Sequence, residues 1–230
     1  MSKKTSEIGF GVLGEIKNNP LSKEELQTWQ SFPTGNIADQ MGRYGAMDSG
    51  IKCSYPIKRM VGTAFTVRVW PTDNLMIHYA LKLVSQGDVI VIDASGDTTT
   101  AVLGALMCSS AKVLGVQGIV IDGVARDAQE IQELGFPLFC RGFTPVGPYK
   151  DGPGEINGII SCGRIVVNPG DIIIGDMDGV VVVPRQYADR VLEATKGKFA
   201  SEQKRFSQIR QGKELYPSWL DETLRSKGLI

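Results

Sequence analysis

Two short runs of β-branched residues, each followed by a segment with helical spacing, constrain the fold more than any other feature of the sequence. Val89–Ile92 precedes such a segment at 101–115, and Ile119–Ile121 precedes another at 126–134. When strand, helix and strand follow one another, the helix returns the chain to the start of the sheet and the strands pair in parallel. The sequence therefore predicts an α/β fold.

Acidic and small residues follow both runs. Asp93–Asp97 comes directly after the first run, and Asp122 and Gly123 end the second. Ligands of α/β proteins bind beyond the carboxyl ends of the strands. Both loops are therefore candidate parts of a binding site.

The remainder of the chain predicts more strands in its middle and helices at both ends. Ser22 precedes a polar segment with glutamates in its first turn, which is typical of a helix N-cap. A chain of 230 residues can bury one substantial core. We expect a single domain over 1–230 with helical extensions at about 1–30 and 185–230, a strand within 53–70, a helix over 74–85 and several short strands over 137–184.

Composition excludes several classes of partner. The 25 Lys and Arg residues equal the 25 Asp and Glu residues, so no basic excess indicates a nucleic-acid ligand. No stretch approaches the roughly 18 apolar residues of a membrane-spanning helix, and the N-terminus lacks the apolar segment of a signal peptide. We expect a cytoplasmic protein that binds neither nucleic acid nor membrane. The cysteines form no CxxC pair, so we expect buried free thiols at Cys53, Cys108, Cys140 and Cys162.

Arg126 and Asp127 begin a predicted helix after a glycine-containing loop. Asp127 has two interpretations: it caps the helix, or its carboxylate holds a hard divalent cation such as Mg²⁺. Arg126 can bind a carboxylate through two parallel hydrogen bonds. Backbone N–H groups of an earlier segment would add donors to the same anion, as suits a 2-oxo acid. That segment consists of Gly104, Ala105, Leu106 and Met107.

Five motifs together resemble the RraA-like family, from about residue 30 to the C-terminus. The branch that they resemble most comprises the 4-hydroxy-4-methyl-2-oxoglutarate and 4-carboxy-4-hydroxy-2-oxoadipate aldolases, in which Arg-Asp is followed by two residues and an acid. Arg126, Asp127 and Glu130 fill that pattern here. The resemblance implies a swivelling-domain-like α/β/α-type sandwich with a β-rich core. The motifs are Pro71–His78, Gly87–Val91, Gly104–Met107, Gly118–Asp127 and Asn168–Val180.

The resemblance also implies a reaction: a class II pyruvate aldolase or oxaloacetate decarboxylase that depends on Mg²⁺ or Mn²⁺ and forms a pyruvate enolate. Arg126 would bind the pyruvoyl carboxylate and C2 oxygen, Leu106 and Met107 would offer their amides, and Asp127 would bind the metal. Such enzymes are homotrimers or homohexamers with sites at subunit interfaces. A neighbouring subunit would add a second acidic ligand, which we assign to Glu202, with Glu193 and Glu214 as alternatives in the same segment.

One residue departs from the aldolase pattern. Ala105 stands where these enzymes carry an acid that positions a water for proton transfer. Losing such a group costs about 10² to 10⁴ in rate, so the departure threatens aldol cleavage more than decarboxylation. Asp93 and Asp97 are alternative proton handlers. His78, the single histidine, lies in an apolar segment, and we expect it to be a packed core residue.

A second function remains open, because the founding RraA proteins are non-catalytic regulators that bind the endonuclease ribonuclease E. Those regulators are shorter and lack the aspartate of the Arg-Asp pair. Asp127 and the terminal extensions therefore favour the enzyme.

Overall fold

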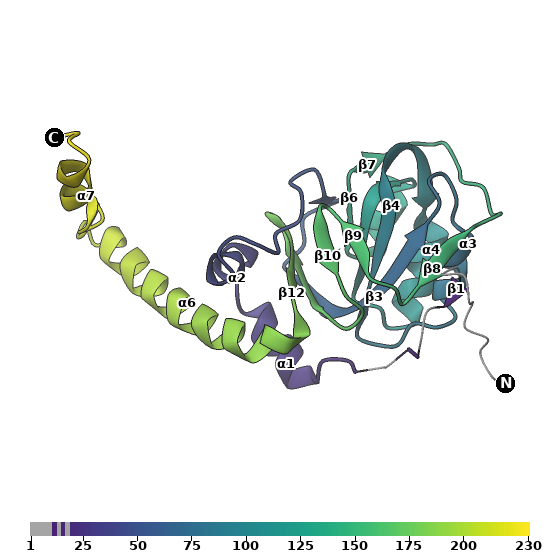
Figure 1. Ribbon diagram of the computed structural model, residues 1–230, viewed down its shortest axis with the longest axis horizontal. Helices are drawn as coiled ribbons and strands as arrows, with labels where there is room; N and C mark the ends of the chain where they lie inside the picture. The colour runs from purple at the N-terminus through teal and green to yellow at the C-terminus, as the bar shows by residue number, and fades with distance from the viewer. Residues whose placement is uncertain (1–10, 13–14, 17–18) are drawn as a thin grey trace.

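A ten-stranded sheet forms the centre of the computed structural model, which describes residues 11–12, 15–16 and 19–230 (Figure 1). Its main path, in spatial order, is β1 (Gly11–Val12), β8 (Gly154–Ile156), β3 (Met60–Val69), β4 (Asp88–Leu103), β5 (Gly118–Ala125), β6 (Leu138–Cys140) and β2 (Lys52–Cys53). Beside this path, β7 (Gly142–Phe143) pairs with β5, and β11 (Ile172–Asp176) pairs with β3 and with β12 (Gly179–Val183).

The strands β3, β4, β5 and β6 run parallel to one another, as the sequence predicts, whereas β8 and β11 pair antiparallel with β3, and β2 pairs antiparallel with β6. Side chains alternate across a strand, so the continuous apolar run in β4 supplies both faces of the sheet. Ile90 and Ile92 belong to the core on one face, and Val89 and Val91 belong to the core on the other. A sheet buried on both faces explains why the run is apolar at every position.

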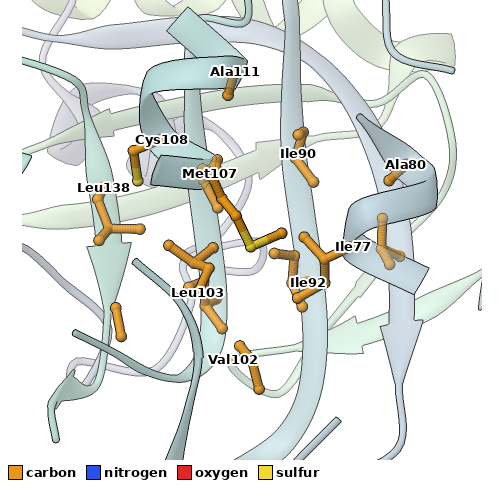
Figure 2. Close-up of a cluster of buried hydrophobic side chains, with 14 of the residues drawn as sticks. Ile77, Ala80, Ile90, Ile92, Val102, Leu103, Met107, Cys108, Ala111 and Leu138 are labelled. Carbon is orange, nitrogen blue, oxygen red and sulfur yellow. The ribbon is translucent and has the colours of Figure 1, made fainter. Parts of the chain in front are cut away.

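Three short helices cover one face of the sheet: α3 (Leu75–Ala80), α4 (Ala105–Val113) and α5 (Ala128–Leu134). Figure 2 shows the Met107 side chain of α4 directed into the space between Leu103, Ile92 and Ile77 of α3. Burying side chains of this kind contributes roughly 1.5–3 kcal/mol each. This packing holds α3 and α4 against neighbouring strands of the sheet.

The other face is covered by the hairpin of β9 (Ile160–Cys162) and β10 (Ile165–Val167). A third apolar cluster joins β11 and β12 to α1 (Lys23–Gln30), α2 (Thr34–Gln40) and the start of α6 (Ala188–Arg210). The rest of α6 and α7 (Leu220–Ser226) extend away from the sheet (Figure 1). The expected α/β class with a β-rich core is confirmed.

Several predicted boundaries need correction. The helix expected over 101–115 begins at Ala105, because β4 continues to Leu103, and the helix expected over 74–85 ends at Ala80. The capped helix after Ser22 is confirmed by a capping box with Glu25, whereas residues 1–10, 13–14 and 17–18 lie outside the described residues. Cys108, Cys140 and Cys162 are buried free thiols, and Cys53 is half-buried. No helix in the described part of the chain is long and apolar enough to cross a membrane.

Candidate active site

The ends of β4 and β5 place two loops side by side. Leu103 and Ala125 are the last paired residues of these parallel strands. Just beyond them, the Arg126 N–H donates to the Leu103 carbonyl oxygen at 3.0 Å. The first turn of α4 and the Arg126–Asp127 pair therefore meet at one edge of the sheet, as expected for an α/β site.

Asp127 has a backbone conformation that aspartate tolerates better than most residues. It precedes α5 with φ 63° and ψ 46°, and its side chain makes no capping hydrogen bond to that helix. Asp127 is thus the N-cap residue of α5, and its carbonyl oxygen accepts the Ile131 N–H at 3.0 Å, but its carboxylate does not cap the helix. Its Oδ2 instead accepts the Ala105 N–H at 3.0 Å, which links the two loops. A side chain at Gly104 would overlap this carboxylate, so the loop requires glycine there.

The Arg126 guanidinium is partly exposed and free to bind an anion. Its Nε lies 3.8 Å from Asp127 Oδ2, a long contact, and 45% of its side chain is accessible. Gly147 lies beside this guanidinium, where a Cβ would come within 3.0 Å of Nη1. The loop that contains Gly147 thus packs over Arg126.

The first turn of α4 offers fewer free donors than expected. The Met107 N–H donates to the Gly104 carbonyl oxygen at 3.1 Å, and the Ala105 N–H is held by Asp127. Within the described part of the chain, the Leu106 N–H has no acceptor outside its own helix. Donors at a helix start lack partners within the helix, so Leu106 is the amide best placed for a ligand.

A pocket of about 200 Å³ joins these groups to residues that sequence reasoning missed. Asn74, the N-cap of α3, is 4% exposed, and its Oδ1 has no hydrogen-bond partner. Lys150 comes from a loop that the β-bridge between Asp73 and Tyr149 ties to the residues just before α3. The lining consists of Asn74, His78, Ala101, Leu103, Gly104, Leu106, Met107, Arg126, Asp127, Pro148 and Lys150.

His78 is exposed and lines this pocket, so its expected place in the core is wrong. The apolar neighbours that suggested burial, Ile77 and Ala80, lie on the other face of α3 and are buried. The spacing of Asn74 and His78, four residues apart on one helix, could have indicated a shared face. Lys150 gave no such signal, because a loop far along the chain brings it to the site.

A second hollow of about 320 Å³ lies on the other side of Arg126 and Asp127 and is completed by Phe143, Thr144 and Pro145. These two residues therefore separate two adjoining spaces. A larger, more apolar groove of about 710 Å³ lies elsewhere, between α2, α6 and the β9–β10 hairpin, and holds none of the expected site residues. Volume alone would therefore have pointed away from the expected site residues.

Other expected residues lie away from Arg126 and Asp127. Asp93 pairs with Arg68, and Asp97 accepts hydrogen bonds from Thr99 and Thr100. Glu130 is exposed on α5. None of these three acids lines either pocket.

The acids expected from a neighbouring subunit also lie apart from the site within one chain. Glu202 is on α6, which Figure 1 shows at the end of the molecule opposite α4, and its carboxylate accepts a hydrogen bond from Asn36 Nδ2 at 2.6 Å and pairs with Lys198 Nζ at 3.0 Å. These hydrogen bonds, that to Asn36 foremost, lower the pKa of Glu202. Glu193 pairs with Lys196, and Glu214 is exposed.

The donor set fits a hard divalent ion that keeps most of its water. Among the described residues, no three His, Cys, Asp or Glu side chains lie together in a group that could hold a metal ion. Mg²⁺ commonly takes one or two carboxylates and fills its other positions with water or ligand oxygens. Asp127, half-exposed between the two hollows, offers one such carboxylate. Burial raises the pKa of the neighbouring Cys108 thiol to about 12, so it is not a nucleophile.

Comparison with known proteins identifies the family. The RraA-like family model, described as Aldolase/RraA, matches residues 34–182, more than half of the chain. The chain belongs to the RraA-like family. An RraA-like relative from Halalkalibacterium halodurans, named provisionally as a 4-hydroxy-4-methyl-2-oxoglutarate aldolase, is 42% identical over 78% of this chain and 86% of its own length.

Solved structures of RraA-like proteins agree with the fold. An uncharacterised protein from Pseudomonas syringae pv. tomato DC3000 has a TM-score of 0.76 at 29% identity, over 86% of this chain and 94% of its own. Streptomyces coelicolor RraAS2, described as an unusual member of the RNase ES inhibitor RraA family, has a TM-score of 0.72 at 27% identity, over 82% and 98%. The family thus includes proteins named as enzymes and proteins named as inhibitors.

Proposed function

We propose that this protein is a divalent-metal-dependent lyase that cleaves a carbon–carbon bond of a 2-oxo acid and releases pyruvate. The observation that carries the proposal is one pocket in which Arg126, Asp127 and the first turn of α4 meet. The name of the Halalkalibacterium relative supports the same reaction. The substrates proposed are 4-hydroxy-4-methyl-2-oxoglutarate and oxaloacetate.

Each end of such a substrate has a matching group in the pocket. Arg126 would bind the pyruvoyl carboxylate and the C2 oxygen, and the Leu106 N–H would add a donor at the positive end of the α4 dipole. Both substrates carry a second carboxylate. Lys150, which lines the same pocket, supplies a cation for it.

Bond cleavage leaves an electron pair that moves onto the C2 oxygen, and the site must stabilise this charge. Mg²⁺ or Mn²⁺ held by Asp127, with Glu202 of the partner subunit as second ligand, would supply Lewis-acid stabilisation. Arg126 and the Leu106 N–H act on the same charge as preorganised donors. Asp127 also holds the Ala105 N–H, which keeps the α4 turn in place for this role.

The proposal is tested by measuring pyruvate release from both substrates with Mg²⁺ and with EDTA. Asp127→Asn is the sharpest variant, because asparagine tolerates positive φ and can still accept the Ala105 N–H, yet loses the charge. We expect EDTA or Asp127→Asn to lower the rate at least about 100-fold. Asp178→Asn, an exposed residue in the β11–β12 turn, is the matched control and should keep wild-type activity.

Wild-type turnover no faster than Mg²⁺ alone would overturn the proposal. The regulator hypothesis would then take its place, since Streptomyces coelicolor RraAS2 is described as belonging to a family of RNase inhibitors. An assay of ribonuclease E cleavage with and without this protein would test it directly.

A further inference from the structure

The proposed aldol cleavage still needs a residue that moves protons. A base must remove the proton of the C4 hydroxyl, and an acid must deliver a proton to C3 of the leaving enolate. Ala105 has no group for either task, and Asp93 and Asp97 are engaged by Arg68 and by threonines outside the pocket.

The first turn of α3 fixes one ionisable side chain at the pocket. Asn74 Nδ2 donates to the Val102 carbonyl oxygen at 3.0 Å and contacts Met107 Sδ at 3.7 Å. These contacts attach the start of α3 to the end of β4 and to the first turn of α4. The His78 N–H then donates to the Asn74 carbonyl oxygen at 3.2 Å, one helical turn later. Residues four apart share a helix face, and both side chains line the pocket.

The His78 ring is exposed, and its side chain makes no hydrogen bond or ion pair with another of the described residues. The other charged side chains that line the pocket are Arg126, Asp127 and Lys150. Guanidinium and ammonium groups ordinarily stay protonated at neutral pH, and the carboxylate of Asp127 is assigned to the metal ion. Imidazole is the remaining group that both accepts and donates protons near neutrality.

We infer that His78 is the general acid–base catalyst of this protein, an inference that rests on the proposed function. His78 would take the role that an acid at position 105, where this chain has alanine, would otherwise serve. Neutral His78 takes the C4 hydroxyl proton as the C3–C4 bond breaks. The bond's electron pair forms the enolate, and C4 becomes a carbonyl carbon. Imidazolium His78 then returns the proton to C3, which becomes the methyl carbon of pyruvate, and the ring is neutral again.

His78→Gln separates proton transfer from metal chemistry. We expect the exchange of pyruvate methyl protons in D₂O and the cleavage of 4-hydroxy-4-methyl-2-oxoglutarate to fall about 100-fold or more. Oxaloacetate consumption, which needs no hydroxyl deprotonation, should change less than about threefold. Adding Ala105→Asp to the variant should restore at least about a tenth of the exchange rate. Lys82→Gln, exposed and one turn further along, is the control.

A second readout does not depend on turnover. The chain has one histidine, so ¹³C-labelled histidine gives one imidazole signal without assignment. We expect this signal to shift when pyruvate is added to the wild-type protein with Mg²⁺.

The failures are distinguishable. Wild-type exchange rates in His78→Gln, equal losses of exchange and decarboxylation, or an imidazole signal indifferent to pyruvate would each overturn the role of His78 and leave the metal-dependent lyase in place. A wild-type protein without metal-dependent turnover would overturn both.

Discussion

At the scale of single residues, Asp127 combines two demands that few side chains meet. Its backbone lies in the left-handed region, which costs other non-glycine residues roughly 1–2 kcal/mol. Its carboxylate must also face both Ala105 and the pocket. Glycine would satisfy the backbone and asparagine the hydrogen bond, but neither supplies the charge. Strain of this kind is typical of functional positions.

Lys150 carries the prediction at this scale. Replacing it with methionine removes the cation proposed for the distal carboxylate and keeps the length of the chain. We expect KM for 4-hydroxy-4-methyl-2-oxoglutarate to rise about tenfold, the effect of one exposed charge-assisted hydrogen bond. Inhibition by pyruvate, which lacks that carboxylate, should stay unchanged. Equal weakening of both ligands would show that Lys150 binds elsewhere.

At the scale of elements, β4 explains both the success and the limits of prediction from sequence. Its first half, Val89–Ile92, was predictable because both faces are buried and every residue is apolar. Its second half, with register shifts after Asp93, contains polar residues and no strand pattern. The Arg126–Asp127 pair could be predicted because it directly follows β5, whereas the α4 turn is singled out by its resemblance to a family motif, since the strand before it has no strand pattern. Lys150 could not, because its place depends on how a distant loop packs.

The start of β4 holds a buried carboxylate that should weaken folding near neutral pH. Burial raises the pKa of Asp88 to about 6 despite the Ser85 N–H that it accepts. The folded state therefore holds this proton more tightly than the unfolded chain. The stability gained is complete below about pH 4 and is lost as the pH rises through about 6.

Asp88→Asn should remove this pH dependence. We expect the variant to be more stable than wild type by at most about 3 kcal/mol at neutral pH, with the difference shrinking toward pH 4. Urea denaturation across this range measures it, with the exposed Asp189→Asn as control. Parallel pH profiles for Asp88→Asn and wild type would contradict the assignment.

At the scale of the whole molecule, α6 is the element whose length is not explained by packing within one chain. Only Val191 and Thr195 of its 23 residues are buried, and Glu202 contacts Asn36 rather than the site. A helix this polar either bridges to another unit or is stabilised by ion pairs along its own surface, such as that between Lys198 and Glu202. The first of these alternatives agrees with the proposal that Glu202 completes the site of another copy.

Mixing two inactive variants tests that proposal. Asp127→Asn and Glu202→Gln should each be inactive alone, and equal amounts refolded together should recover about a quarter of wild-type activity if sites form between subunits. Asn36→Ala tests whether Glu202 matters only for the structure of its own chain, because this variant removes the hydrogen bond within the chain but leaves the Glu202 carboxylate. No recovery in the mixture would show that Glu202 does not serve a second subunit.

The extended α6 has a consequence for how activity would depend on abundance. If one ligand of every site arrives on another chain, a folded monomer is a complete scaffold with an incomplete site. The rate would then rise faster than linearly with protein concentration until assembly saturates, and dilution would silence the protein reversibly without unfolding it.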